Sequence, residues 1–161
     1  MHETIEGRAL GCEDMVLLNQ SGRVAEATGS CILMVREGSV FTPPASEGAL
    51  ESITLLAIEA LARTQGIPFE RRPIDRTELV VADELAICGT LAEVVPVKTI
   101  EGRPLPADSP LLKALQTGYY QAVRGIAPHP EIVMTQVTPA IKKNKKTAGR
   151  FGVVRNPRSA R

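Results

Sequence analysis

Residues 17–42 read LLNQSGRVAEATGSCILMVREGSVFT, a stretch in which apolar runs alternate with turn-forming residues. The apolar run over residues 15–18 predicts a strand that is followed by a polar turn. A second strand is predicted over Cys31–Arg36, and a third over residues 40–42. Because only a short turn containing Gly38 separates the last two, we expect them to pair as a β-hairpin.

The clearest helix signal follows this hairpin. Apolar residues recur at three- and four-residue spacing over residues 53–65, with Ser52 placed to cap the start and Gly66 the end. A last helix is predicted over residues 110–125, with Ser109 as its cap. The other signals are a short helix over 77–82 and strands over 69–72, 85–88 and 94–100. This mixture predicts an α/β (α+β) fold with a mixed sheet and packed helices.

The chain has 161 residues, of which 43% are hydrophobic, enough for one domain with a real core. Only 3% are aromatic and tryptophan is absent, so aliphatic side chains must fill that core. The 19 basic and 18 acidic residues give a net charge of +1. The charge is unevenly distributed, because residues 1–130 have a net charge of −6 and residues 131–161 have a net charge of +7. We therefore expect a mildly acidic body with a basic C-terminal extension.

The cysteines and histidines favour neither a disulfide framework nor a metal site. Cys12, Cys31 and Cys88 are widely spaced and contain no CxxC pair, which favours a reducing, cytoplasmic setting. The two histidines, His2 and His129, lack the spacing of metal ligands, so no metal is expected. No signal-peptide pattern opens the chain, and the longest apolar run is too short to cross a membrane.

The residues by themselves form no self-contained catalytic motif, because the sequence has no GxGxxG, no P-loop and no suggested nucleophile–base set. What remains is a scatter of small polar residues at element junctions. Ser52 and Thr54 open a helix, where they either cap it or help its free amides to bind an anion. Gly89-Thr90 is a turn or part of a phosphate site. Glu26 alone would be a surface carboxylate.

The order of several short stretches carries a resemblance to a known family. The stretches are residues 17–30, VFTPP at 40–44, GALESIT at 48–54, ADE at 82–84, CGTLAEVVPV at 88–97 and IEGRP at 100–104. They resemble the class IV aminotransferases, which use pyridoxal 5′-phosphate (PLP), and within that class the branched-chain amino-acid aminotransferases most of all. The resemblance covers about residues 6–125. It implies the C-terminal large domain of fold-type IV PLP enzymes, which is similar to that of D-amino-acid aminotransferase.

The resemblance assigns a role to each matching position. Glu26 matches the carboxylate that contacts the pyridine nitrogen of PLP, where a negative charge keeps that nitrogen protonated and the ring able to accept electrons. Leu50 matches an apolar residue packed against the ring. The other matches are Ile53, Thr54 and Thr90 for the cofactor phosphate, and the amides of Thr90 and Leu91 for the substrate carboxylate.

Several positions depart from the family's pattern. Ser52 replaces a glycine, residues 55–56 replace Arg-Asp, Leu91 replaces an alanine and Cys31 replaces an asparagine. The largest departure concerns the Schiff-base lysine, which the resemblance places about ten residues upstream of Met1. No lysine of this sequence matches it, so no catalytic residue is assigned within the chain.

The resemblance implies that residues 1–127 are the C-terminal domain of such an enzyme without its N-terminal domain, and that residues 128–161 are a basic extension. We expect the cofactor-binding domain of a branched-chain-type aminotransferase, which moves an amino group between a branched-chain amino acid and 2-oxoglutarate through PLP. We expect this chain to be inactive in isolation. We also expect it to form a homo-oligomer or to pair with the missing N-terminal half.

The sequence also allows three other interpretations. D-amino-acid aminotransferases and aminodeoxychorismate lyases share much of the scaffold, so the substrate preference rests on resemblance alone. A degenerate, non-catalytic domain that binds PLP, phosphate or a partner chain is also compatible with the departures. The basic extension invites nucleic-acid binding, but its single aromatic residue, Phe151, disfavours it.

Overall fold

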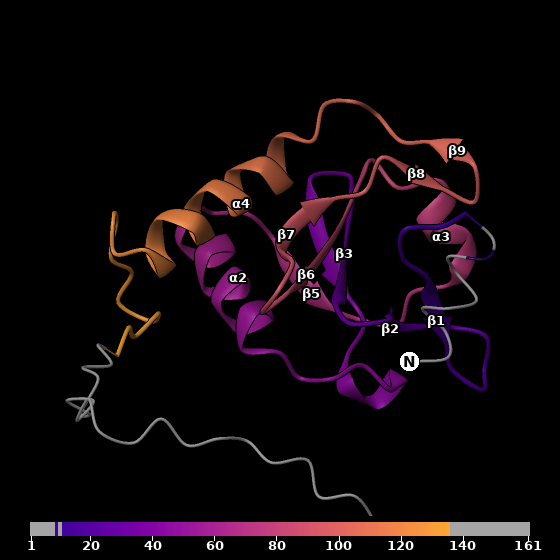
Figure 1. The fold of residues 1–161 in the computed structure, drawn as a ribbon, viewed down its shortest axis with the longest axis horizontal. Helices are drawn as coiled ribbons and strands as arrows, with labels where there is room; N and C mark the ends of the chain where they lie inside the picture. The colour runs from indigo at the N-terminus through magenta and orange to yellow at the C-terminus, as the bar shows by residue number, and fades with distance from the viewer. Residues whose placement is uncertain (1–8, 10, 136–161) are drawn as a thin grey trace, which may run out of the picture.

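The computed structural model describes residue 9 and residues 11–135 (Figure 1). At its centre lies a five-stranded sheet with the strand order β5-β4-β3-β6-β7. The strands are Phe69–Arg71 (β5), Ser39–Thr42 (β4), Cys31–Arg36 (β3), Glu84–Gly89 (β6) and Glu93–Pro96 (β7). Neighbouring strands are antiparallel except β4 and β5, which are parallel. The mixed sheet that the sequence predicts is therefore confirmed.

Two helices cover one face of the sheet. They are α2 (Ile53–Thr64) and α4 (Pro110–Val123), which lie together on one side of the strands in Figure 1. Side chains alternate between the two faces of a strand, so every second residue of β3 and β6 points toward these helices. Leu33 and Ala86 are fully buried there, together with Leu55 of α2. This cluster is the larger part of the core.

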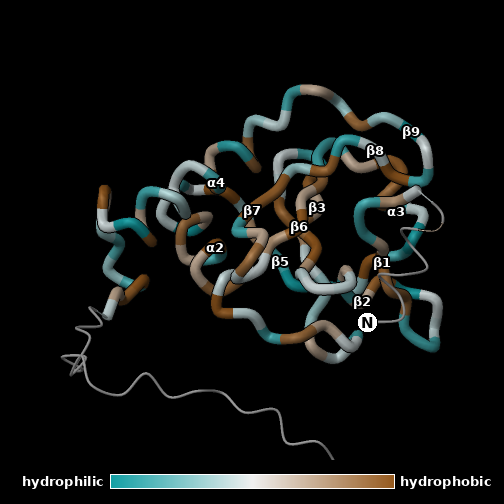
Figure 2. Tube along the Cα trace, viewed as in Figure 1, coloured by the Kyte–Doolittle hydropathy of each residue, from teal (hydrophilic) through white to brown (hydrophobic). Residues whose placement is uncertain are grey.

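The opposite face of the sheet is covered by smaller elements. The intervening residues of β3 and β6, among them Met34 and Leu85, pack against Ile74 and against α3 (Arg76–Val80). A two-stranded antiparallel pair, β1 (Val16–Leu18) and β2 (Val24–Ala27), completes this side. Figure 2 shows hydrophobic residues along the central strands, as a sheet buried on both faces requires.

The hairpin expected around Gly38 is confirmed. Arg36 of β3 pairs with Ser39 of β4, which leaves Glu37 and Gly38 as a two-residue turn. Both turn residues have positive φ, 51° and 75°. Such a turn matches the right-handed twist of the strands, and glycine adopts its conformation without the cost that a side chain imposes.

The strands differ from the sequence-based expectation in three places. The sequence did not predict β2, because its four residues include the polar Glu26 and give only a short apolar signal. The single strand expected over 94–100 is instead two strands, β7 and β8 (Thr99–Ile100). Pro96 ends β7, since proline has no N–H to continue the ladder. β8 pairs with the unpredicted β9 (Arg103–Pro104) across a turn at 101–102.

The start of α2 follows the sequence prediction, whereas the start of α4 does not. The Ser52 hydroxyl accepts a hydrogen bond from the Leu55 amide at 3.4 Å, as a cap does. Asp75 caps α3 through a capping box with Glu78. Ser109 occupies the N-cap position of α4, but its side chain makes no capping hydrogen bond. Its predicted role as a side-chain cap is therefore wrong.

A carboxylate from the sheet caps α4 in place of Ser109. Glu84, at the start of β6, accepts hydrogen bonds from the Leu111 amide at 3.1 Å and from the Leu112 amide at 2.9 Å. Glu84 is buried, and the amides at a helix start carry the positive end of the helix dipole. A glutamate 27 residues upstream of Leu111 is beyond the reach of any local capping pattern.

The residues after α4 contact the C-terminal end of α2. His129 Nε2 and the Thr64 hydroxyl lie 2.8 Å apart, and Ile132 packs against the larger core cluster. The boundary expected at residue 127 stays a prediction, and residues 136–161 of the basic extension lie outside the described part of the chain. Among the described residues, the helices are too short or too polar to cross a bilayer.

Candidate functional site

Three connections meet at one end of the central sheet. One connection precedes β3, one precedes α2 and one follows β6. The antiparallel register that pairs Cys31 with Cys88 places the start of β3 beside the end of β6, so the connections before β3 and after β6 lie at the same end of the sheet. The approach is close, because a Cβ built on Gly89 would lie 3.3 Å from the carbonyl oxygen of Gly29. A side chain at position 89 would therefore be tightly packed at this end of the sheet, and the neighbouring loop would have to shift by a few tenths of an ångström to admit it.

Glu26 lies at this end and holds the loop that leads into α2. Its Oε2 atom accepts a hydrogen bond from the Leu50 amide at 3.0 Å, and its side chain is half-buried. The Cys31 thiol donates to the Leu50 carbonyl at 3.6 Å, so the backbone of Leu50 is held from both sides. The Leu50 side chain remains 72% exposed. Oε1 of Glu26 makes no hydrogen bond within residues 11–135, which leaves one acceptor available to a ligand.

The start of α2 presents two free donors beside this loop. The amides of Ile53 and Thr54 occupy the first two helical positions, where no helical carbonyl is available to accept from them. The Ile53 side chain is 76% exposed, whereas Thr54 is buried. The Thr54 hydroxyl lies 3.5 Å from the Tyr119 hydroxyl on α4. Thr54 is therefore buried as a whole residue, and its hydroxyl faces the core.

Thr90 and Leu91 form an exposed turn after β6. Leu91 is fully exposed, with a relative accessibility of 101%. Within the described chain, no hydrogen bond joins either residue to Glu26, Leu50 or Thr54. The structure thus joins Glu26 to Leu50 by a hydrogen bond, three residues before α2 begins, and places the turn at the neighbouring strand end without a direct link.

The described part of the chain contains two lysines. Lys98 is exposed between β7 and β8, and the amine of Lys113 lies 3.2 Å from Asp108 beside the first turn of α4. Neither makes a hydrogen bond to the residues of this site among those described. The expectation that no lysine of this chain is catalytic stays a prediction.

The sequence did not predict a cluster around the buried Glu47, which holds the segment that leads to the Leu50 loop. Glu47, in the short 3-10 helix η1 (Ala45–Glu47), accepts hydrogen bonds from Arg23 at 2.7 and 2.9 Å and from the Asn19 amide at 2.6 Å. The hydrogen bond from Arg23 lowers the pKa of Glu47. Only the fold brings residues 24 positions apart together, so no local pattern predicts this cluster.

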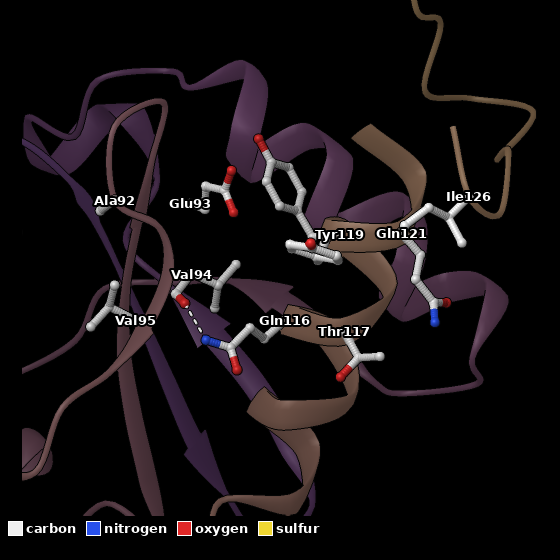
Figure 3. Close-up of a pocket in the computed structure, with 10 residues that line it drawn as sticks. Ala92, Glu93, Val94, Val95, Gln116, Thr117, Tyr119, Gln121 and Ile126 are labelled. Atoms are coloured by element: carbon white, nitrogen blue, oxygen red, sulfur yellow. Dashed lines mark hydrogen bonds between the residues drawn. The ribbon is translucent and has the colours of Figure 1, made fainter. Parts of the chain in front are cut away.

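A separate groove lies between β7 and α4 (Figure 3). Its volume is about 450 Å³, and Gln116 crosses it to donate a hydrogen bond to the Val94 carbonyl at 2.7 Å. Arg124 lies 3.8 Å from the centre of the Tyr120 ring, and its pKa is raised by its hydrogen bond to Glu93. None of the residues assigned to the cofactor or substrate lines this groove.

Known proteins similar to this chain include branched-chain-amino-acid aminotransferases. A sequence model of "Amino-transferase class IV" matches residues 2–100. A probable branched-chain-amino-acid aminotransferase of Synechocystis is 42% identical over 107 residues, which are 66% of this chain and 35% of that protein. A probable branched-chain-amino-acid aminotransferase of Aquifex aeolicus is 41% identical over 118 residues, which are 71% of this chain and 38% of that protein.

Solved structures agree with the sequence comparison. A branched-chain aminotransferase from Thermoproteus uzoniensis, solved with norvaline, matches with a TM-score of 0.76 at 36% identity over 79% of this chain and 42% of its own. A T.th. branched-chain amino acid aminotransferase, solved with N-(5′-phosphopyridoxyl)-L-glutamate, matches with a TM-score of 0.75 at 32% identity, over 79% of this chain and 43% of its own. The match therefore spans less than half of each relative. By the family model that covers more than half of its length, the chain belongs to the class IV aminotransferases.

Proposed function

We propose that this chain is the cofactor-binding part of an aminotransferase that binds PLP and acts on branched-chain amino acids with 2-oxoglutarate. The observation that carries the proposal is the hydrogen bond between Glu26 and the Leu50 amide, which fixes a half-buried carboxylate beside the free amides of α2. The T.th. relative was solved with a phosphopyridoxyl compound and with pyridoxamine 5′-phosphate. The substrate class is drawn from the names of the relatives.

The residues present fit the cofactor in part. The free Oε1 atom of Glu26 would accept a hydrogen bond from the protonated pyridine nitrogen, and the exposed Leu50 side chain would cover the ring. The amides of Ile53 and Thr54 would bind the phosphate at the positive end of α2. When bound, PLP supplies an electron sink for the charge that develops on the amino acid during transfer.

The turn after β6 would receive the substrate. The Thr90 hydroxyl is exposed and suits a phosphate contact, and the amides of Thr90 and Leu91 suit a substrate carboxylate. Because Leu91 is large and fully exposed, it narrows the space beside that carboxylate. The buried Thr54 hydroxyl would have to leave Tyr119 before it could contact the phosphate.

The remainder of the enzyme would supply what the described residues lack. A reactive lysine and a cation for the phosphate are the two missing groups, and more than half of each solved relative lies outside the match. We therefore propose that activity requires this remainder, either as a partner chain or as further polypeptide, and that the assembled enzyme is oligomeric. Free thiols in the core suit a reducing compartment such as the cytoplasm.

PLP binding to the purified chain tests the proposal. Equilibrium dialysis should show saturable PLP binding, and Glu26→Gln should weaken it about tenfold, the order expected when a charged acceptor is lost. Glu70→Gln, on the exposed face of β5, is the matched control and should bind like the original chain. Assays with branched-chain amino acids and 2-oxoglutarate should show no steady turnover by the chain alone.

Three outcomes would contradict parts of this proposal. Absence of binding at millimolar PLP would refute the cofactor site, and equal binding by Glu26→Gln would refute the role of that carboxylate. Steady turnover by the isolated chain would refute the need for the remainder of the enzyme. Binding of inorganic phosphate without any preference for PLP would favour the degenerate, non-catalytic domain.

A further inference from the structure

Cys31 and Cys88 face each other across the central pair of strands. Cys31 begins β3, Cys88 lies next to the end of β6, and the two are directly opposite in the antiparallel register. Both belong to the core cluster under α2 and α4, so their side chains leave the sheet on the same face. Cys31 is 4% exposed and Cys88 is fully buried, and both are free thiols.

The backbone geometry of this pair suits a disulfide. Directly opposite residues of antiparallel strands have Cα atoms about 4.5–5.5 Å apart. Disulfides join Cα atoms that are about 4.4–6.8 Å apart, so the Cα separation of this pair lies within the range that a disulfide spans. Cys12, the remaining cysteine, is exposed and lies before β1, outside this core cluster.

The surroundings of Cys31 favour its reaction over that of Cys88. The hydrogen bond from Cys88, with a smaller one from Ser52, lowers the pKa of Cys31 although burial opposes the shift. The contact with Cys31 and burial both raise the pKa of Cys88. Because the thiolate is the nucleophile, Cys31 is the thiol that reacts first and Cys88 the one that resolves the product.

We propose that Cys31 and Cys88 are an oxidisable dithiol which a small peroxide converts into an intramolecular disulfide. The Cys31 thiolate attacks one oxygen of hydrogen peroxide, the O–O bond breaks, and Cys31 becomes a sulfenic acid as hydroxide leaves and takes up the Cys31 proton to form water. The Cys88 sulfur then attacks the Cys31 sulfur. The S–O bond breaks and the leaving hydroxide takes the Cys88 proton. The two thiols lose two electrons, and one peroxide becomes two waters.

Oxidation of Cys31 would change the hydrogen bonding of the loop that contains Leu50. The Cys31 thiol donates to the Leu50 carbonyl, and a disulfide sulfur has no proton to donate. The Leu50 backbone would then be held by the Glu26 carboxylate alone. Oxidation of the two thiols would therefore remove one of the two hydrogen bonds that hold the loop before α2. This inference does not depend on PLP binding.

Peptide mapping of the folded chain tests the dithiol. After treatment with hydrogen peroxide and blocking of free thiols, trypsin without reductant should release residues 24–36 linked to residues 77–98, lighter by two hydrogen atoms than the two peptides together. The free thiols should fall from three to one, independently of protein concentration. Dithiothreitol should restore all three.

Two variants make the result specific. Cys12→Ser should give the same linked peptides, because Cys12 is not a partner. Cys88→Ala should give none, and should instead accumulate Cys31 sulfenic or higher acids. The proposal would be overturned if the only disulfide-linked peptides were ones that include Cys12. It would also be overturned if Cys31 of the original chain were oxidised to a sulfinic acid without forming a disulfide. The linked peptides from the original chain decide the question even if Cys88→Ala fails to fold.

Discussion

Single side chains far from the sheet decide how the site is held. Glu47 is almost fully buried, yet it carries a charge that Arg23 and Asn19 satisfy completely. Burial of a carboxylate is favourable only with such partners. Because Glu47 ends the segment that leads to Leu50, this cluster ties the site loop to the turn between β1 and β2.

The depressed pKa of Glu47 predicts a pH dependence of stability. In the unfolded chain this carboxyl titrates near its ordinary value of 4.5, and in the folded protein it titrates lower because Arg23 donates to it. Its contribution to the free energy of unfolding is therefore complete above about pH 4.5 and is lost as the pH falls through the lower, folded value.

Denaturant unfolding between pH 6 and pH 3 measures this effect. The original chain should lose more stability over that interval than Glu47→Gln, which has no charge to titrate. Glu70→Gln provides the control for removal of one exposed carboxylate and should follow the original chain. Parallel pH profiles for all three proteins would show that Glu47 does not contribute in this way.

At the scale of elements, each helix start obtains its acceptors differently. α2 uses the local Ser52 hydroxyl, and α4 uses the distant Glu84 carboxylate. The Ser52 cap is the one predicted from the sequence. It stabilises the helix while leaving the amides of Ile53 and Thr54 free.

Removal of this cap should cost stability without a change of fold. Ser52→Ala should lower the free energy of unfolding by about 1 kcal/mol, the usual loss for an N-cap hydroxyl. That corresponds to a fall in Tm of about 2–4 °C for a chain of this size. Ser52→Asp keeps an acceptor at the cap and should unfold near the original temperature. Calorimetry that finds equal losses for both variants would remove the cap as the cause.

The sequence predicted those elements whose signal is local. The β3–β4 hairpin and α2 were found because a turn glycine, a cap and a regular apolar spacing lie within a few residues of each other. The division of 94–100 into β7 and β8, and the cap of α4, depend on partners elsewhere in the fold. The site followed the same rule: Glu26, Leu50 and α2 were named from a motif, whereas the Asn19–Arg23–Glu47 cluster has no motif.

The whole molecule exposes apolar side chains at the end of the sheet where the site lies. Leu50, Ile53 and Leu91 are each more than two thirds exposed. Exposed apolar patches on a soluble domain commonly mark an interaction surface. The relatives extend well beyond the matched region, so we expect the remainder of the enzyme to cover this patch.

Without that cover, the chain should self-associate through the patch. Sedimentation should show a weight-average mass that rises with concentration, and Leu91→Asp should weaken the association about tenfold, as the loss of one buried leucine contact predicts. Val81→Asp, at an exposed position beyond α3, is the matched control and should associate like the original chain. Equal weakening by both variants would mean that the association does not use the patch.

The hydrogen bonds from the α4 amides to the Glu84 carboxylate of β6 also predict how fast those amides exchange with solvent. First-turn amides of a helix ordinarily exchange with solvent deuterium rapidly, as that of the exposed Ile53 should. The amides of Leu111 and Leu112 donate to Glu84, so they should exchange as slowly as the amides of β6 itself. Deuterium exchange followed by NMR would measure both sets in one sample. Slow exchange would mean that the start of α4 opens only when the strand detaches, so that a helix and a strand separated by twenty residues unfold as one unit.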